Sequence, residues 1–235
     1  MAVIDDLVLR ENADLEVAHY ARHYFANVTS LDQYVGIVLN ELKSQGILDN
    51  TIVIFTSDHG EMLGSHGRTG KNVMENEAIA IPFIIHYPER LRPAVSTEIL
   101  NVTDILPTVL GLAGLGELIS EDIQGSDLSG SLLMDETGSG AQNAALLMLG
   151  SQRGLYTAEY TLCVAEDPGG DTISAAYMYD NLSDPYQLHR IDIRERPELA
   201  RKMLIRLGQK LAESNDPWYK EQKYDDVIIY PYSEP

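Results

Sequence analysis

The sequence predicts an α/β protein with a doubly wound sheet, in which helices cover both faces of mainly parallel strands. Two observations lead to this fold class. A long amphipathic helical pattern runs directly into a continuous apolar strand, and that strand is followed by a glycine-rich segment carrying acidic and imidazole side chains. A third observation concerns residues 144–235, where three strand-like runs precede a helical pattern. These runs predict a second group of strands followed by a helix.

The first helix is indicated by apolar residues at three- and four-residue steps, which mark one face of a long helix. These residues are Val17, Tyr20, Tyr24, Val28, Leu31, Val35, Val38 and Leu42. Gly46 is placed to end the helix. Residues 51–56 then form a β-branched apolar run without polar interruption, as in a parallel strand that is buried on both faces.

The later elements follow from similar patterns. A second strand is expected at residues 79–86, where Pro82 implies a sheet edge, a bulge or a strand start. A helix capped by Asp104 would place Pro107 in its first turn and would stop within residues 111–114. Residues 116–143 are expected to form a surface connection or lid. Beyond them we expect strands and one helix, at residues 144–149, 154–164, 173–179 and 196–213.

The segment after the first strand concentrates chemically active side chains. Asp58 and His59 leave the strand at its carboxyl end, where open α/β sheets bind their ligands. Four glycines allow the chain to turn closely around a bound group, at positions 60, 64, 67 and 70. A carboxylate suits Ca²⁺ or Mg²⁺, and an imidazole widens the choice toward Mn²⁺ or Zn²⁺. The alternative for Asp58 is a turn cap without a metal, and the alternative for Lys71 is a solvated surface lysine.

This segment resembles the sulfatase family, in which a strand and Asp-His-Gly-Glu are followed by His-Gly and a lysine. Four further stretches resemble family landmarks, in the family order. They are residues 24–32, 81–85, 103–110 and 178–188, the last similar to the family pattern LYDLxxDPxEL. One Asp-His-Gly alone would be a weak signal, but five ordered landmarks spanning residues 20 to 190 are a specific one. The resemblance implies the fold of the alkaline-phosphatase superfamily and hydrolysis of sulfate esters.

The resemblance also implies roles for four residues. Asp58 and His59 would bind one divalent metal, with Ca²⁺ preferred and Mg²⁺ or Mn²⁺ open, and the metal would polarise a sulfate oxygen. Lys71 lies 71 − 58 = 13 residues after Asp58, the family spacing of a sulfate-contacting lysine. His66 would contact the leaving group or the substrate, or act only as a local hydrogen bonder. Glu61 is expected to pack or cap the loop.

One family motif is absent from residues 1–235, namely Cys/Ser-x-Pro/Ala-x-Arg, whose first residue becomes the formylglycine nucleophile. The single cysteine, Cys163, lacks the following proline and arginine and is expected to be a buried strand residue. We therefore expect the carboxyl-terminal portion of a sulfatase. The resemblance implies that residues 1–143 complete the catalytic α/β domain and that residues 144–235 form a closing subdomain, a small antiparallel sheet with a packing helix. The isolated chain would be inactive, since the formylglycine would lie on the missing part.

Charge narrows the expected partners. Seventeen basic and thirty-six acidic residues give a net charge of −19, which repels nucleic acid and long sulfated polymers. A small sulfate ester is the expected substrate, although a bound cation and a lysine can dominate the local field. No run approaches the roughly 18 apolar residues of a membrane span. The sequence does not indicate an oligomeric state.

Several alternatives stay open. Residues 1–6 lack a signal pattern, and any signal would lie on the missing amino-terminal part. The compartment therefore stays unknown, with a cytoplasmic location and a periplasmic or secreted one both open. A phosphonate monoester or phosphodiester hydrolase of the same superfamily is the alternative activity, and a truncated inactive fragment is the non-enzymatic one. Two-metal members of the superfamily need additional histidines, whereas Lys71 favours the one-metal type. His19 and His23, on the first helix, are expected to be structural.

Overall fold

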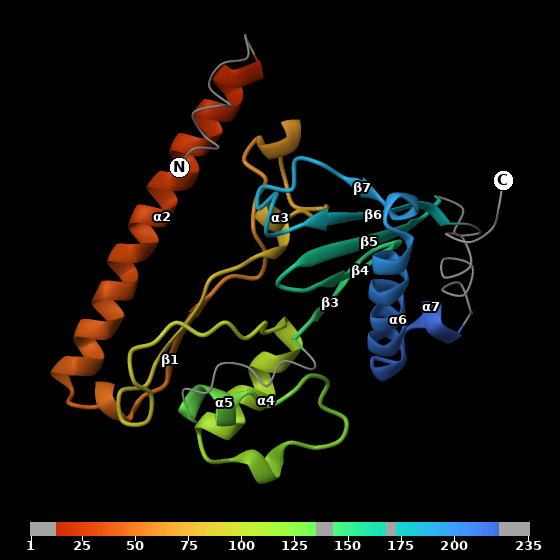
Figure 1. The fold of residues 1–235 in the computed structure, drawn as a ribbon. Coiled ribbons are helices and arrows are strands. Elements are labelled where there is room, and N and C mark those ends of the chain that lie inside the picture. The colour runs from red at the N-terminus through yellow and green to blue at the C-terminus, as the bar shows by residue number, and fades with distance from the viewer. Residues whose placement is uncertain (1–12, 135–142, 168–172, 221–235) are drawn as a thin grey trace. The chain divides into compact units, whose positions relative to one another are not determined.

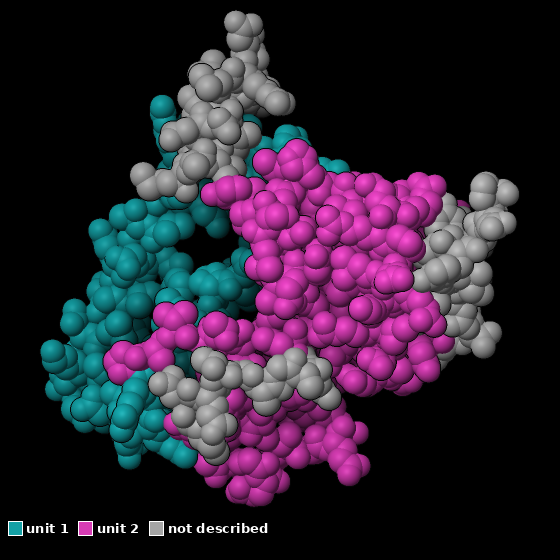
Figure 2. Space-filling model, viewed as in Figure 1, with its two compact units in different colours: residues 1–92 teal, residues 93–235 magenta. Residues whose placement is uncertain are grey.

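A computed structural model describes residues 13–134, 143–167 and 173–220. The chain forms two compact units, residues 1–92 and residues 93–235, which Figure 2 distinguishes by colour. The predicted division at residue 143, between a catalytic part and a closing subdomain, stays a prediction. None of the helices in the described ranges combines the length and apolarity needed to cross a membrane.

The first unit begins with the long helix α2 (Ala13–Ser44), which confirms the predicted helix (Figure 1). Gly46 ends it in the left-handed conformation, at a φ of 69°, as helix-terminating glycines commonly do. The predicted apolar stripe is present but is not buried. Tyr20, Val28, Leu31 and Val38 are 47% to 55% exposed. The sequence pattern therefore identified the helix but not what covers its apolar face.

Two short strands form the sheet of the first unit, β1 (Val53–Thr56) and β2 (Phe83–His86). They pair antiparallel, with Val53 opposite His86 and Thr56 opposite Phe83. Within the described residues, β1 therefore lacks the parallel partner that we expected. A continuous apolar run indicates that a strand is buried on both faces, but it does not indicate the direction of the neighbouring strand. A short helix, α3 (Asn76–Ile79), occupies the start of the predicted second strand, which begins only after Pro82. Pro82 therefore stands just ahead of the strand start.

The second unit contains a five-stranded antiparallel sheet whose strands are adjacent in sequence order (Figure 1). The strands are β3 (Ala145–Leu149), β4 (Gln152–Tyr156), β5 (Tyr160–Glu166), β6 (Ile173–Asp180) and β7 (Ile191–Asp192). The expected single strand over residues 154–164 was wrong. Thr157 turns the chain there, because its N–H donates to the Tyr160 carbonyl (2.8 Å) and its hydroxyl accepts from the Tyr160 N–H (2.9 Å).

Helix α6 (Pro197–Glu213) packs on this sheet and forms the main core, as predicted, and α7 (Pro217–Lys220) follows it. Pro197 opens α6 in the first turn, where its missing N–H is not needed. The core is made mostly of aliphatic side chains from both layers, including Leu155, Leu162, Val164, Met178, Met203, Leu204, Leu207 and Leu211. Cys163 is buried in β5, and Trp218 docks on the core. Tyr224, Tyr230 and Tyr232, further along the chain, lie outside the described residues.

Two helices precede the sheet in the second unit, α4 (Ile105–Leu112) and α5 (Ser129–Met134). Asp104 stands at the start of α4, but its side chain does not cap that helix. It accepts from the backbone N–H of Asn101 and of Ser126, at 2.7 Å each. The Asp104 side chain therefore caps the preceding turn of 3-10 helix, η3 (Val102–Asp104). It also binds the backbone of the loop that contains Ser126.

Candidate active site

The corner after β1 carries the two predicted metal ligands. One carboxylate oxygen of Asp58, Oδ1, accepts from the His59 N–H at 2.9 Å. This hydrogen bond is the main reason that the pKa of Asp58 lies below its ordinary value, and the neighbouring His59 ring and Ser57 hydroxyl act in the same direction. The Asp58 side chain is exposed. Asp58 thus presents an ionised carboxylate at the end of the strand.

The imidazole of His59 is oriented by its own backbone neighbour. Its Nδ1 lies 2.8 Å from the Gly60 carbonyl oxygen. Because a carbonyl only accepts, the hydrogen of the neutral ring belongs on Nδ1, and Nε2 keeps its lone pair. Nε2 lies 3.3 Å from Asp58 Oδ2. Two electron-pair donors therefore face each other, in a ring orientation typical of metal-binding histidines.

Gly60 allows α3 to lie against this corner. Its N–H donates to the Ala78 carbonyl at 2.8 Å. A Cβ atom at position 60 would lie 1.9 Å from the Glu77 carbonyl oxygen and 2.9 Å from its carbon. Since both atoms belong to the backbone, they cannot move aside as a flexible side chain would. The glycine of the Asp-His-Gly motif is required here by close packing.

We expect Gly60→Ala to destabilise the first unit by about 1–3 kcal/mol, the usual cost of forcing a methyl group into a filled space. Gly36→Ala is the matched control, because a Cβ there meets nothing within 4 Å. In mid-helix the control should stabilise by roughly 0.5–1 kcal/mol. Urea unfolding followed by circular dichroism measures both. Equal effects of the two substitutions would contradict the packing argument.

The segment from Glu61 to Lys71, called the return loop below, folds back on itself. The Met62 N–H donates to the Gly70 carbonyl (2.8 Å), and the Gly70 N–H donates to the Glu61 carboxylate (2.6 Å). The expected capping role of Glu61 is therefore confirmed. This pairing brings the backbone at Gly70, and with it Lys71, back beside the residues that follow the corner.

The predicted site residues are only partly brought together by direct contacts. Asp58 and His59 are in contact, whereas Lys71 is exposed and has no ion-pair partner among the described residues. His66 turns its Nε2 toward Glu77, at 3.7 Å from Oε1. Sequence reasoning did not identify Glu77, because nothing in the pattern of α3 distinguishes it from a solvated helix residue. The metal-binding and sulfate-binding roles remain predictions.

The two histidines of α2 contact each other on the helix surface, and their expected structural role stays a prediction. His19 and His23 are exposed, their ring centroids are 4.3 Å apart, and His23 Nδ1 lies 2.9 Å from the His19 carbonyl oxygen. Within the described ranges, no group of three or more His, Cys, Asp or Glu side chains is arranged to hold a metal. The described part of the chain therefore brings one carboxylate and one imidazole together, at Asp58 and His59, and does not provide a full coordination sphere.

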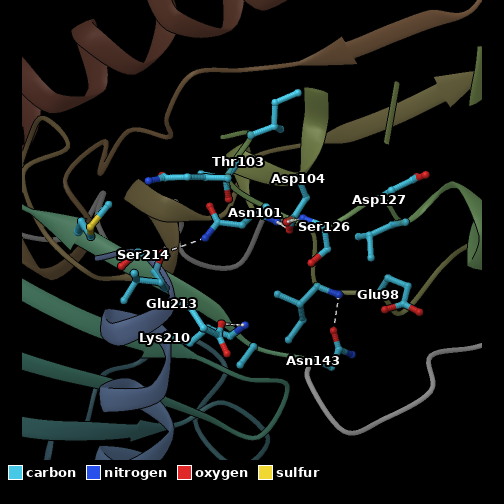
Figure 3. Close-up of a pocket in the computed structure, with 18 of the residues that line it drawn as sticks. Glu98, Asn101, Thr103, Asp104, Ser126, Asp127, Asn143, Lys210, Glu213 and Ser214 are labelled. Atoms are coloured by element: carbon cyan, nitrogen blue, oxygen red, sulfur yellow. Dashed lines mark hydrogen bonds and ion pairs between the residues drawn. The ribbon is translucent and has the colours of Figure 1, made fainter. Parts of the chain in front are cut away.

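The second unit contains a polar pocket of about 840 Å³ between residues 98–128 and the end of α6 (Figure 3). Several polar side chains that line it already make structural hydrogen bonds. Asn143 accepts from the Ile99 N–H at 2.6 Å, Asn101 donates to the Leu146 carbonyl at 3.0 Å, and Lys210 pairs with Glu213 at 2.9 Å. None of the predicted site residues, Asp58, His59, His66 and Lys71, lines this pocket.

Known sulfatases are similar to this chain. A family model described as Sulfatase matches residues 7–115. The chain belongs to the sulfatase family, within the alkaline-phosphatase-like superfamily. An endo-4-O-sulfatase of Bacteroides thetaiotaomicron is 36% identical over 248 residues, which cover 97% of this chain and 48% of that protein. The chain thus spans about half the length of this curated relative.

Solved structures show the same fold. A sulfatase structure from work on glycosaminoglycan metabolism in B. thetaiotaomicron has a TM-score of 0.83 and 33% identity, over 95% of this chain and 48% of that one. A structure in complex with its substrate D-glucosamine-2-N,6-O-disulfate has a TM-score of 0.77 and 29% identity, over 93% and 45%. A phosphonate monoester hydrolase of Agrobacterium radiobacter, 20% identical with a TM-score of 0.66 over 86% and 42%, shares the fold alone. The predicted α/β sulfatase-like fold class is confirmed.

Proposed function

We propose that this chain supplies part of the active site of a sulfuric ester hydrolase. In the reaction, one hydroxyl of the hydrated formylglycine attacks sulfur, the bond between sulfur and the ester oxygen breaks, and the alcohol leaves with a proton. The bond between the formylglycine carbon and the sulfated oxygen then breaks, which releases sulfate and restores the aldehyde for hydration by water.

The observation that carries the proposal is that Asp58 Oδ2 and His59 Nε2 lie 3.3 Å apart at the corner after β1. The return loop that follows this corner folds back on itself and ends at Lys71. Two electron-pair donors so placed suit a metal cation, and a lysine after them suits the negative charge of a sulfate group.

Asp58 and His59 would hold one divalent ion, and Ca²⁺ is our first choice, with Mg²⁺ or Mn²⁺ as alternatives. The donor set fits such an ion, because Asp58 is kept ionised and Nε2 of His59 keeps its lone pair. Hard divalent ions lie about 2.0–2.6 Å from their ligands, so both atoms can reach one ion. When bound, the metal would polarise a sulfate oxygen and offset negative charge.

Lys71 would contact the sulfate group. The ester carries one negative charge, and charge on the transferred group and the departing oxygen grows as the bond stretches. A fixed ammonium beside these oxygens stabilises the transition state more than the bound ester. The support is the spacing to Asp58 and the hydrogen bonds of Gly70 that return the chain toward Met62 and Glu61. Lys71 is exposed and thus accessible to a ligand.

The substrate that we propose is a sulfate ester on a small saccharide. Two similar proteins support a sugar: one is named an N-acetylglucosamine-6-O-sulfatase, and one was solved with D-glucosamine-2-N,6-O-disulfate. The net charge of −19 disfavours long sulfated polymers. Phosphonate monoester hydrolysis is the second candidate, since the phosphonate monoester hydrolase of Agrobacterium radiobacter shares the fold. Higher identity to the sulfatases favours the first.

We expect the isolated chain to hydrolyse 4-nitrophenyl sulfate no faster than the metal ion alone, because residues 1–235 contain no Cys/Ser-x-Pro/Ala-x-Arg nucleophile motif. A hybrid enzyme gives the positive counterpart. In it, this chain replaces the matching part of the endo-4-O-sulfatase relative, and the rest of that protein supplies the nucleophile. Turnover by the hybrid and none by the chain supports the proposal. Turnover by the isolated chain that Asp58→Ala abolishes would overturn it.

Metal binding can be tested separately from turnover. We expect Asp58→Asn to weaken Ca²⁺ binding to the hybrid enzyme by at least about tenfold, because affinity for hard cations depends on the number of charged ligands. Asp32→Asn, at an exposed position of α2, removes the same charge elsewhere and should leave affinity unchanged. Isothermal titration with Ca²⁺ measures both variants. Equal affinities for Asp58→Asn and the original hybrid would remove Asp58 from the metal site.

A further inference from the structure

His66 adopts a backbone conformation that needs support. Its φ and ψ are 55° and 21°, in the left-handed region. A residue with a Cβ atom is disfavoured there and stays only when its surroundings impose the conformation. The adjacent Gly67 N–H donates to the Gly64 carbonyl at 2.9 Å, which closes the turn around His66. The turn accounts for the backbone path but not for the direction of the imidazole.

The imidazole of His66 points at a carboxylate from another element. Nε2 lies 3.7 Å from Glu77 Oε1, and the two side chains are only 14% and 23% exposed. Both Nε2 of His66 and Oε2 of Glu77 are buried without a hydrogen-bond partner among the described residues. Burying either group alone would be unfavourable. Each is therefore the natural electrostatic partner of the other, from the return loop on one side and α3 on the other.

Glu77 also touches the other end of the site through its backbone. Its carbonyl oxygen lies where a Cβ of Gly60 would be, and the next residue, Ala78, accepts the Gly60 N–H. One residue of α3 thus contacts the corner that bears Asp58 and His59 and, through its carboxylate, the middle of the return loop. The loop ends in the Gly70 hydrogen bonds that precede Lys71.

We propose that Glu77 is a positioning residue whose carboxylate holds the His66 imidazole. This contact keeps the return loop in the conformation that carries Lys71 back toward the corner that bears Asp58 and His59. The effect on the loop is a property of this chain, and only its consequence for catalysis rests on the proposed function.

Amide hydrogen exchange of the isolated chain tests the loop without any substrate. In Glu77→Gln, we expect the Met62, Gly64 and Gly70 amides to exchange at least about tenfold faster, while β1 amides stay unchanged. His66→Gln should give the same rise. The double variant should be no faster than either single variant, because both remove one interaction. Glu89→Gln, an exposed glutamate of the same unit, is the control and should change nothing.

Unchanged loop exchange in Glu77→Gln would overturn the proposal, and so would additive effects of the two substitutions. If Glu77→Gln unfolds the whole unit, His66→Gln decides: a rise confined to the loop supports the proposal. A rise everywhere in the unit for both variants overturns it, because the pair would then belong to the general core and would not be a contact that positions the loop.

Kinetics of the hybrid enzyme test the consequence for catalysis. Glu77→Gln should lower kcat by about 10- to 100-fold, as loss of a supporting partner of an active-site group typically does, with little change in KM. In a Lys71→Ala background the same substitution should have no further effect, since Glu77 acts through the loop that bears Lys71. An inactive hybrid would count against the proposed function and leave the exchange result intact. A full additional loss on top of Lys71→Ala would overturn the coupling of Glu77 to Lys71.

Discussion

In the hybrid enzyme, Lys71→Ala is expected to lower kcat by roughly 10² to 10³, about 2.7–4 kcal/mol, the typical loss for one electrostatic donor at a developing charge. The change in KM should be much smaller, because the bound ester carries less charge at the reacting oxygens than the transition state does. Lys71→Arg should recover only part of the rate, since a broad planar guanidinium does not replace a compact ammonium after a tight glycine turn.

Steady-state kinetics on 4-nitrophenyl sulfate measure this effect. Lys43→Ala is the matched control, an exposed lysine in the last turn of α2 that should leave both constants unchanged. A raised KM with an unchanged kcat would make Lys71 a residue that only binds the substrate. No change in either constant would return it to the solvated surface lysine that the sequence alone also allows.

Arg153→Ala is expected to destabilise the second unit by about 3–5 kcal/mol, the usual cost of leaving a buried charge without its partner. Arg153 Nε lies 2.9 Å from Asp216 Oδ2, and the two side chains are 12% and 4% exposed. The guanidinium also stands 5.1 Å from the centre of the Trp218 ring. Together these contacts fasten α7 to β4, and alanine would remove all of them.

Urea unfolding followed by tryptophan fluorescence is the measurement, since Trp218 is the only tryptophan. Arg201→Ala, at an exposed position of α6, should change stability by less than about 0.5 kcal/mol. The double variant Arg153→Met with Asp216→Leu should recover most of the loss, because neither charge is then buried. A loss below about 1 kcal/mol for Arg153→Ala would show that this ion pair does not hold the end of the chain.

The fold was predictable where local pattern and burial agree. The helices α2 and α6 and the strands β3 and β6 follow from apolar periodicity and were found close to the expected bounds. The direction of β1 was not predictable, because an apolar run carries no information about its partner. The break between β4 and β5 depends on hydrogen bonds of the Thr157 side chain and backbone, which a strand-forming composition conceals. The exposure of the α2 stripe is likewise a tertiary property.

The candidate site was predictable to the extent that it is local in sequence. Asp58 and His59 are adjacent in the chain, and the glycine spacing predicted a loop that returns to the strand end. The hydrogen bond from Met62 to Gly70 folds the loop back on itself, whereas the approach of Lys71 to Asp58 stays a prediction. The role of Glu77 could not be predicted, since it depends on how α3 lies against Gly60. For the same reason, the sequence left the partner of His66 open, and the structure points its imidazole at Glu77.

The most direct test of sulfate-ester hydrolysis is the ratio of kcat/KM for 4-nitrophenyl sulfate to that for 4-nitrophenyl phenylphosphonate, measured with the hybrid enzyme and its Asp58→Asn and Lys71→Ala variants. We predict a ratio well above one for the hybrid enzyme. In Lys71→Ala the sulfate activity should fall at least about 100-fold, and excess metal ion should not restore the activity of either variant. A ratio below one, or sulfate turnover that is indifferent to both substitutions, would contradict the assignment of this site to sulfate esters.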